Sequence, residues 1–355
     1  MSKFSNERTA SLVPYTPGEQ PKKNQKYIKL NTNESPFAPS PRAQKMAAEA
    51  GGRLNLYCDP TCRELTELFA EKNGVAPECV LMTNGSDEIL NFAFMAFCGE
   101  GRPAVFPDIT YGFYPVFADL NGVPYETVPL REDFSINVED YIGINKNIFI
   151  ANPNAPTGIA LPLSDIERIV ASNPDNIVVI DEAYVDFGAE SAVQLTKRYK
   201  NLIVTQTFSK SRSLAGARLG AGIADAALIA DMNTIKYSTN PYNVNSMTQA
   251  AGIGSLLDED YTRKNLDIII SAREYTAKEL SALGFVLTSS SANFIFAAHP
   301  DIDGEKLYFE LKARGILVRH FSGERINNYN RITVGLPEDM QTLVKTIREI
   351  LENIK

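Results

Sequence analysis

The sequence predicts an α/β protein built on a mainly parallel sheet. Short apolar runs recur along the first two thirds of the chain, and stretches with apolar residues three and four positions apart lie between them. Several runs end directly in polar residues, as Ile177–Ile180 does in Asp181. This alternation is typical of right-handed βαβ units whose sheet is covered by helices on both faces.

We expect three parts in the 355-residue chain. Residues 1–40 are rich in Pro, Asn and Lys, which indicates an extended arm rather than a packed element. Residues 41–262 are predicted to form a large domain with a seven-stranded sheet. The expected strands are Cys79–Met82, Ala104–Phe106, Tyr125–Val128, Asn147–Ala151, Ile177–Ile180, Leu202–Thr205 and Leu219–Ile223.

Residues 263–355 are predicted to form a smaller α+β domain. Its first element is a long helix over Arg263–Leu283, because apolar residues recur there at helical spacing and Gly284 is a typical residue to follow a helix end. The later elements are strands at Asn293–Ala297, Ile316–Val318 and Arg331–Val334, and a terminal helix from Glu338.

Composition excludes several classes of protein. A net charge of −8 without a dense basic run argues against nucleic-acid binding. No apolar stretch is long enough for a membrane span, and the first twenty residues lack the apolar core of a signal peptide. Four cysteines without a C-x-x-C pair suggest reduced thiols in a cytoplasmic protein. Two histidines make a His-rich metal site or a Ser–His triad improbable, and we expect no metal.

Polar residues at the strand ends carry the chemistry. Asp181 and Tyr184 follow one predicted strand, and Lys210 and Arg218 follow the next. In open α/β sheets the carboxyl ends of the strands meet at one edge, where ligands bind. These side chains suit a phosphorylated, electron-withdrawing ring. Pyridoxal 5'-phosphate (PLP) fits them, with the lysine as covalent anchor and the aspartate on the ring nitrogen.

A phosphate site is predicted where the strand Cys79–Met82 leads into a helix. Gly85 allows a tight turn, Ser86 can cap the helix, and the first helical N–H groups are free donors. An ordinary capping box explains the same residues, and a helix dipole contributes only about 0.3–1 kcal/mol. Arg218 and the Ser209 hydroxyl would add charge-assisted bonds of about 1.5–3 kcal/mol each.

Other groups have both a functional and an ordinary interpretation. Asn152–Gly158 is either a plain proline-rich turn or a source of an amide for a ring oxygen. Tyr111 either stacks on a planar ring or belongs to the core. Arg319 and Arg331, beside the last β-like runs, suit carboxylate or phosphate recognition, and solvated salt bridges are the alternative.

Taken in this order, the motifs resemble the fold-type I PLP-dependent aminotransferases, most closely those that act on histidinol phosphate. The most specific segments are Asp181–Phe187, Phe208–Lys210 and Leu214–Arg218. The resemblance covers nearly the whole chain, through Leu12–Tyr15, Leu30–Pro36 and Arg331–Gly335.

The resemblance implies a role for each catalytic residue. Lys210 would bind the cofactor covalently and then move a proton between the substrate Cα and the cofactor. Its amine must be neutral to act as base, and nearby positive charge favours that form. Asp181 would pair with the ring nitrogen, Tyr184 would bond the ring oxygen, and Tyr111 would stack on the ring.

The resemblance also implies which residues bind the phosphate group of the cofactor. The turn at Gly85, the backbone N–H groups of Ser86 and Asp87, and the side chains of Ser209 and Arg218 would surround the cofactor phosphate. The negative charge of Asp87 opposes a phosphate, so we expect its side chain to point elsewhere.

Substrate and partner roles follow in the same way. Arg331, assisted by Arg319, would bind the anionic end of the substrate. Tyr57 matches a residue that reaches the phosphate from the neighbouring subunit, and Tyr15 matches an arm residue lying over the partner's substrate. Both imply a homodimer with shared sites.

Two positions depart from the family. Ala155 stands where many relatives have asparagine, and Asn154 is expected to take over the bond to the ring oxygen. Cys58 follows Tyr57 where the family usually has proline, which loosens that loop.

The expected reaction is a two-stage transamination in histidine biosynthesis. It interconverts L-histidinol phosphate plus 2-oxoglutarate with imidazole-acetol phosphate plus L-glutamate, with ping-pong kinetics. An aromatic amino-acid aminotransferase and a threonine-phosphate decarboxylase remain alternatives, since both share the fold. A non-catalytic binding module is disfavoured because Lys210 and Asp181 are present. A Rossmann dehydrogenase is disfavoured because no strand leads into a G-x-G-x-x-G turn.

Overall fold

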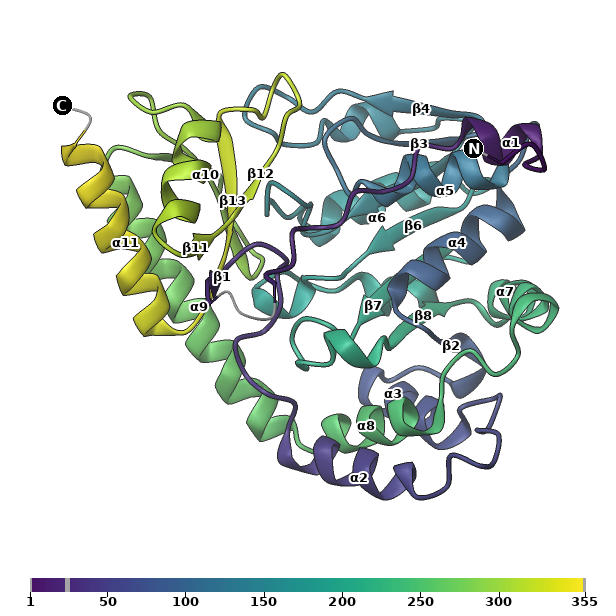
Figure 1. Cartoon of the computed structure of the whole chain (residues 1–355). Coiled ribbons are helices and arrows are strands. Elements are labelled where there is room, and N and C mark those ends of the chain that lie inside the picture. The colour runs from purple at the N-terminus through teal and green to yellow at the C-terminus, as the bar shows by residue number, and fades with distance from the viewer. Residues whose placement is uncertain (1, 23–25, 354–355) are drawn as a thin grey trace.

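A seven-stranded sheet forms the centre of the larger part of the molecule in the computed structural model, which describes residues 2–22 and 26–353 (Figure 1). Its strand order is β2-β8-β7-β6-β5-β3-β4, and only β8 runs antiparallel to its neighbours. All seven predicted strands are therefore confirmed, with some ends shifted by a residue or two. They are β2 (Val80–Thr83), β3 (Ala104–Pro107), β4 (Tyr125–Val128), β5 (Asn147–Ala151), β6 (Val178–Asp181), β7 (Leu202–Thr207) and β8 (Gly220–Ala224).

Helices cover both faces of this sheet because successive strand residues point to opposite sides. In β5, Ile148 and Ile150 belong to one core cluster, while Phe149 belongs to the other. On the Phe149 face lie α4 (Ser86–Phe97), α5 (Phe113–Asn121) and α7 (Ala226–Thr239). On the opposite face lie α3 (Arg63–Asn73), α6 (Leu163–Ser172) and α8 (Ser246–Leu256), and α2 (Pro41–Gly51) packs on α8.

The smaller part contains a four-stranded antiparallel sheet in the order β12-β13-β10-β9. Its strands are β9 (Val286–Leu287), β10 (Phe294–Ala298), β12 (Arg319–His320) and β13 (Tyr329–Thr333). Its helices are α9 (Glu259–Ala282), α10 (Gly304–Ala313) and α11 (Pro337–Glu352).

The predicted long helix is confirmed as α9, which begins four residues earlier than expected. It is followed by Gly284 at a φ of +93°, a conformation that favours glycine. The proposed domain boundary at residues 262 and 263 falls within α9, which packs against α8 and also against α11. The exact division of the chain stays a prediction.

The prediction of an unpacked arm is wrong for the segment from Ile28 to Asn33, and residues 23–25 of the predicted arm lie outside the described part of the chain. After a short α1 (Glu7–Ser11), the chain reaches β1 (Ile28–Lys29), which pairs in parallel with β11 (Ile316–Leu317). Leu30, Asn31 and Asn33 are buried. Figure 1 shows this purple segment passing between the two parts of the molecule. The pairing joins it to the smaller part, and proline content alone does not reveal such a long-range contact.

Short 3₁₀ turns complete the chain at Pro77–Cys79, Val138–Tyr141, Val185–Phe187, Ala192–Lys197 and Ala215–Ala217. Within the described ranges, no helix combines the length and the apolar character needed to cross a membrane.

Candidate active site

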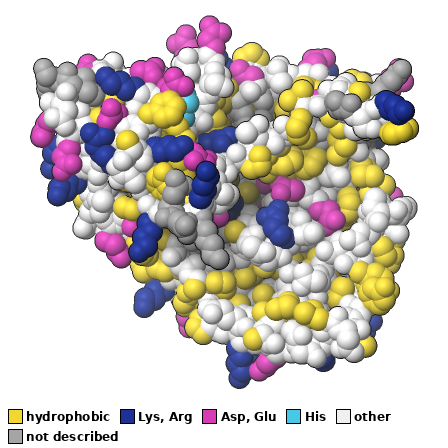
Figure 2. Space-filling view, in the orientation of Figure 1, with side chains coloured by type: hydrophobic (Ala, Val, Ile, Leu, Met, Phe, Trp, Pro, Cys, Tyr) yellow, Lys and Arg dark blue, Asp and Glu magenta, His cyan; other side chains and the backbone are white. Residues whose placement is uncertain are grey.

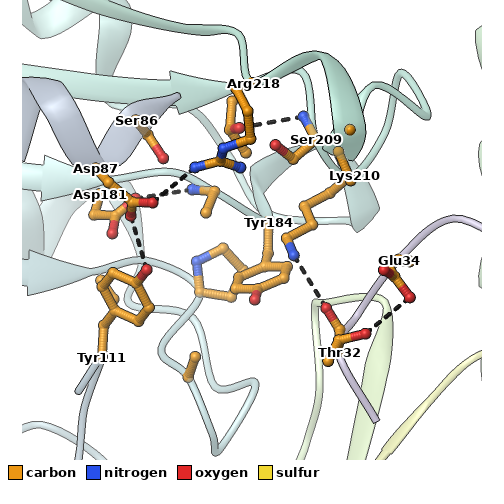
Figure 3. A pocket seen from close by; sticks show the side chains of 17 residues that line it. Thr32, Glu34, Ser86, Asp87, Tyr111, Asp181, Tyr184, Ser209, Lys210 and Arg218 are labelled. Carbon is orange, nitrogen blue, oxygen red and sulfur yellow. Dashed lines mark hydrogen bonds and ion pairs between the residues drawn. The ribbon is translucent and has the colours of Figure 1, made fainter. Parts of the chain in front are cut away.

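The predicted strand-end residues meet at one edge of the large sheet (Figure 3). Asp181 ends β6, and Lys210 lies three residues beyond the end of β7. Arg218 reaches the same edge because antiparallel β8 starts there, with Gly220 opposite Thr83 of β2. These groups line a cavity of about 350 Å³. The space-filling view shows a hollow in the middle of this face in which basic and acidic side chains lie together (Figure 2).

Asp181 is a buried carboxylate at the floor of this cavity. Tyr114 Oη donates to its Oδ2 over 3.2 Å, and the Ala183 N–H donates to its Oδ1 over 3.2 Å. Burial, with the nearby charge of Asp87, raises the pKa of Asp181 to about 7. It forms no ion pair within residues 2–22 and 26–353. Because a buried carboxylate is costly without a cation, this environment fits a protonated ring nitrogen.

Lys210 extends into the cavity from the opposite side (Figure 3). Its Nζ donates to the Thr32 carbonyl over 3.3 Å and lies 5.8 Å from the centre of the Tyr184 ring. Thr32 Oγ1 donates to Glu34, which also pairs with Lys29. The amine is therefore held by one neutral acceptor and is free to reach a ligand.

The turn before α4 offers a cradle for an anion. Gly85 has a φ of +80°, and a Cβ on it would lie 2.6 Å from Arg218 Nη2. The N–H groups of Ser86 and Asp87 lie in the first helical turn, where no intrahelical acceptor exists. The hydroxyl of Ser209 lines the same cavity. The structure places Gly85, not Ser86, at the N-cap, without a side-chain capping bond, so the capping prediction is wrong.

The expectation that the Asp87 side chain points away from the phosphate site is also wrong. Its Oδ2 lies 2.9 Å from Arg218 Nη2, and its Oδ1 accepts a hydrogen bond from Tyr111 Oη over 2.7 Å (Figure 3). A carboxylate in the first turn of a helix is stabilised by the dipole, and here it also has two strong donors. Burial, then Asp87, raises the pKa of Tyr111 well above its usual value. Tyr111 is thus fixed at the cavity wall.

The expectation for Asn154 is contradicted as well. Its Oδ1 accepts from Thr110 Oγ1, and its Nδ2 donates to the Ile109 carbonyl and to Thr157 Oγ1. One of these bonds lies within the loop Asn152–Gly158, the other two tie the loop to Ile109 and Thr110, and Ala155 lines the cavity in place of Asn154. Because the amide has no spare donor facing the cavity, Asn154 does not replace the missing asparagine.

A second cavity, of about 620 Å³, shares Thr32, Tyr111, Ala155, Tyr184 and Lys210 with the first. It is also lined by the arginines Arg319, Arg325 and Arg331.

Arg331 and Arg319 lack carboxylate partners in the described part of the chain. Arg331 Nη2 donates to the Asn31 carbonyl, and its buried Nε has no partner there. Burial lowers the pKa of Arg331 below its usual value, which a bound anion would offset. Arg319 donates only to the carbonyls of Thr16 and Pro17. The structure therefore favours anion binding over the salt-bridge alternative for both.

The two tyrosines assigned to a shared interface lie in different places. Tyr15 lines the second cavity of its own chain, and its ring stacks on Phe113 with centroids 4.2 Å apart. This contradicts its assignment to the partner's substrate. Tyr57 is 85% exposed, stacks on Tyr242 and lines neither cavity.

Sequence reasoning missed four residues of the site. Thr32 accepts a hydrogen bond from Lys210, and Asn33 donates one to Tyr184. The sequence indicated them only through their place in Leu30–Pro36, one of the segments that resemble the family. Tyr114 bonds Asp181, and its position one helical turn after Tyr111 was an available clue. Arg325 ion-pairs with Asp108 at 2.8 Å in the second cavity, and no sequence pattern marks it.

Comparison with known proteins gives consistent matches. The model of the family "Aminotransferase class I and II" matches residues 25–347. The chain is 48% identical to a histidinol-phosphate aminotransferase of Brachyspira hyodysenteriae, covering 99% of this chain and 100% of that protein. It is 49% identical to histidinol-phosphate aminotransferase 1 of Burkholderia pseudomallei, covering 99% of each.

Solved structures share the fold. Histidinol-phosphate aminotransferase from Sinorhizobium meliloti, crystallised with pyridoxal-5'-phosphate, matches with a TM-score of 0.91 at 22% identity, covering 100% of this chain and 99% of that one. A putative histidinol-phosphate aminotransferase from Erwinia carotovora atroseptica matches with a TM-score of 0.85 at 27% identity, covering 92% and 96%.

Proposed function

The chain belongs to the class I and II aminotransferase family, and on that premise we propose that it moves an amino group between L-histidinol phosphate and 2-oxoglutarate. The products are imidazole-acetol phosphate and L-glutamate, and the reaction belongs to histidine biosynthesis. The observation that carries this proposal is the junction of two cavities. One presents Lys210 opposite the buried Asp181, and the other presents Arg319 and Arg331, which have no carboxylate partner among the described residues.

The cofactor is PLP, whose ring withdraws electrons from the substrate Cα when it is bound. Asp181 would keep the ring nitrogen protonated, because a positive charge beside this carboxylate would relieve the cost of burying it. Lys210 would anchor the cofactor, and its amine would hold and move a proton at the substrate Cα. The Thr32 carbonyl orients this amine without supplying a charge of its own. Tyr184 lies beside this amine and would donate to the ring oxygen.

The turn before α4 would hold the phosphate group of the cofactor. The N–H groups of Ser86 and Asp87, the Ser209 hydroxyl and the Arg218 guanidinium converge there. The Asp87 carboxylate holds both Arg218 and Tyr111, which places the cation and the stacking ring before the ligand arrives. These contacts would orient the cofactor toward Lys210.

The arginine cavity takes the anionic end of each substrate in turn. Arg331 accepts either the phosphate of histidinol phosphate or a carboxylate of glutamate, and Arg319 assists with the phosphate. Tyr15 closes one wall of this cavity and helps to exclude water. Because both substrates use one site in succession, ping-pong kinetics follow.

The protein is proposed to work in the cytoplasm as a homodimer. Large apolar side chains stand exposed around Tyr57, namely Leu54, Leu56, Tyr242 and Met247. A second copy would cover them, and Tyr57 would then reach the phosphate site of the partner. This surface supports the proposal of sites shared between subunits.

One assay tests the substrate assignment. The purified, PLP-loaded protein is given glutamate with imidazole-acetol phosphate, phenylpyruvate or 4-hydroxyphenylpyruvate, and 2-oxoglutarate is measured. We expect kcat/KM to be highest for the phosphorylated acceptor. A higher value for the aromatic keto acids would reassign the enzyme to aromatic amino acids. Carbon dioxide release from threonine phosphate would indicate the decarboxylase.

A further inference from the structure

The Tyr184 hydroxyl faces the cofactor cavity on a side where the neighbouring loop supplies no polar side chain. That loop contributes Pro153 and Ala155 to the wall, since the amide of Asn154 is engaged elsewhere. The phenol itself has one partner in the described chain, because Asn33 Nδ2 donates to Tyr184 Oη over 2.9 Å.

The orientation of the Asn33 amide is set by Thr333. The Thr333 hydroxyl oxygen accepts from the Asn33 N–H over 2.9 Å, and its one hydrogen goes to Asn33 Oδ1 over 3.0 Å. A reversed amide would leave that hydrogen facing a second donor. The Nδ2 group therefore faces Tyr184, and the phenol oxygen must accept there.

We propose that Asn33 is a positioning residue that makes Tyr184 a hydrogen-bond donor toward the cofactor's ring oxygen. Because the phenol accepts from Asn33, its single hydrogen is left for the cavity. The inference rests on the proposed function and extends it to a residue that does not line the cofactor cavity.

Asn33 is held firmly enough to perform this role. Its side chain is 1% exposed, and its φ of +55° is a left-handed conformation that Asn and Asp adopt more readily than other non-glycine residues. Its carbonyl accepts from Asn293 Nδ2 over 3.1 Å. Asn33 is thus fixed to the smaller part of the molecule through its backbone and through the oxygen of its side-chain amide.

The test compares Asn33→Asp with Tyr184→Phe and with the double variant. Aspartate keeps the size and the backbone conformation but presents an acceptor to Tyr184, so the phenol would donate to it and not to the ring oxygen. The readout is the pH midpoint of the visible absorbance band of bound PLP. Each single variant should raise this midpoint by about one unit or more, as expected for losing a hydrogen bond to a charged oxygen.

The double variant separates this route from a simple charge effect. If Asn33 acts through the phenol, Asn33→Asp adds nothing in the Tyr184→Phe background. A midpoint that rises there as well would overturn the proposal, as would an Asn33→Asp midpoint equal to wild type. Lys210 and Arg331, the charged groups that face Tyr184 in the wild type, are kept in every variant, so the introduced aspartate is the one added charge.

Asn330→Asp is the matched control. Asn330 is equally buried in β13, and its Nδ2 donates to the Gly304 carbonyl, remote from Tyr184. Its midpoint should equal that of wild type. If the wild-type protein showed no visible band with PLP, the proposed function itself would fail, which is distinct from failure of the Asn33 role.

Discussion

Lys210 is the residue that would bind the cofactor covalently in the proposed mechanism. Lys210→Ala should remove the visible absorbance of the PLP-loaded protein and abolish turnover, because no other lysine among the described residues lines the cofactor cavity. Absorbance spectra and the glutamate assay check this. Lys45→Ala is the control, since this lysine is 77% exposed on α2 and should behave as wild type. Transamination by Lys210→Ala at the wild-type rate would end this mechanism.

Asp181 makes the stability of the cofactor-free protein depend on pH. Its pKa is about 7 in the fold, against an ordinary value of 3.8, so the folded state holds this proton more tightly than the unfolded state. The contribution of the protonated Asp181 side chain to the stability of the fold is therefore complete below pH 4 and is lost as the pH rises through 7. Urea unfolding should show a loss of about 2–4 kcal/mol over this window.

The variant Asp181→Asn separates the contribution of Asp181 to this pH dependence from the contributions of other buried groups. Glu182 is also buried with a pKa raised to about 7, so it adds a similar dependence to both proteins. The difference between wild type and Asp181→Asn therefore reports Asp181 alone. Identical pH profiles for the two proteins would show that the Asp181 carboxylate is not strained by burial.

Strand β8 packs closely against the turn before α4. A Cβ on Gly220 would clash with the Ser86 N–H and the Gly85 backbone, whereas a Cβ on Gly222 would press on the Ile89 side chain, 2.7 Å away. Gly220→Ala should therefore displace the phosphate-binding turn, and Gly222→Ala should only overpack the core.

We expect Gly220→Ala to raise the dissociation constant for PLP about tenfold or more, since losing one bond to a charged group costs about 1.5–3 kcal/mol. Gly222→Ala should keep near wild-type affinity while losing about 1–3 kcal/mol of stability. Absorbance titrations and urea unfolding measure the two quantities. Equal loss of affinity in both variants would argue that the effect is general destabilisation.

Elements differ in how far the sequence reveals them. The strands of the large sheet were predictable because β5 and β6 are short apolar runs, buried along their whole length. The two-residue β1 was not, since its pairing of Ile28 with Ile316 joins residues far apart in sequence. The same holds in the site. Lys210 and Asp181 stand at or after the ends of predictable strands. The contact of Asn33 with Tyr184 joins residues far apart in sequence, so no local pattern reveals it.

The location of Tyr57 raises the question of whether each active site is built from one chain or from two. Lys210 lines the cofactor cavity, whereas Tyr57 lies on an exposed apolar surface outside it. If Tyr57 serves the partner's phosphate site, one site of a mixed dimer of Tyr57→Phe and Lys210→Ala chains has both residues intact. The other site carries both defects.

Mixing the two inactive or weakened variants should therefore restore activity, up to about half of wild type per mixed dimer, because one of its two sites is whole. The mixture is made by unfolding and refolding both variants together at limiting PLP, and activity is compared with each variant refolded alone. A mixture of Lys210→Ala with Asp181→Asn is the control. Both residues belong to one chain's cavity, so it leaves every site with a defect. Absence of recovery in the first mixture would mean that each site is built from a single chain.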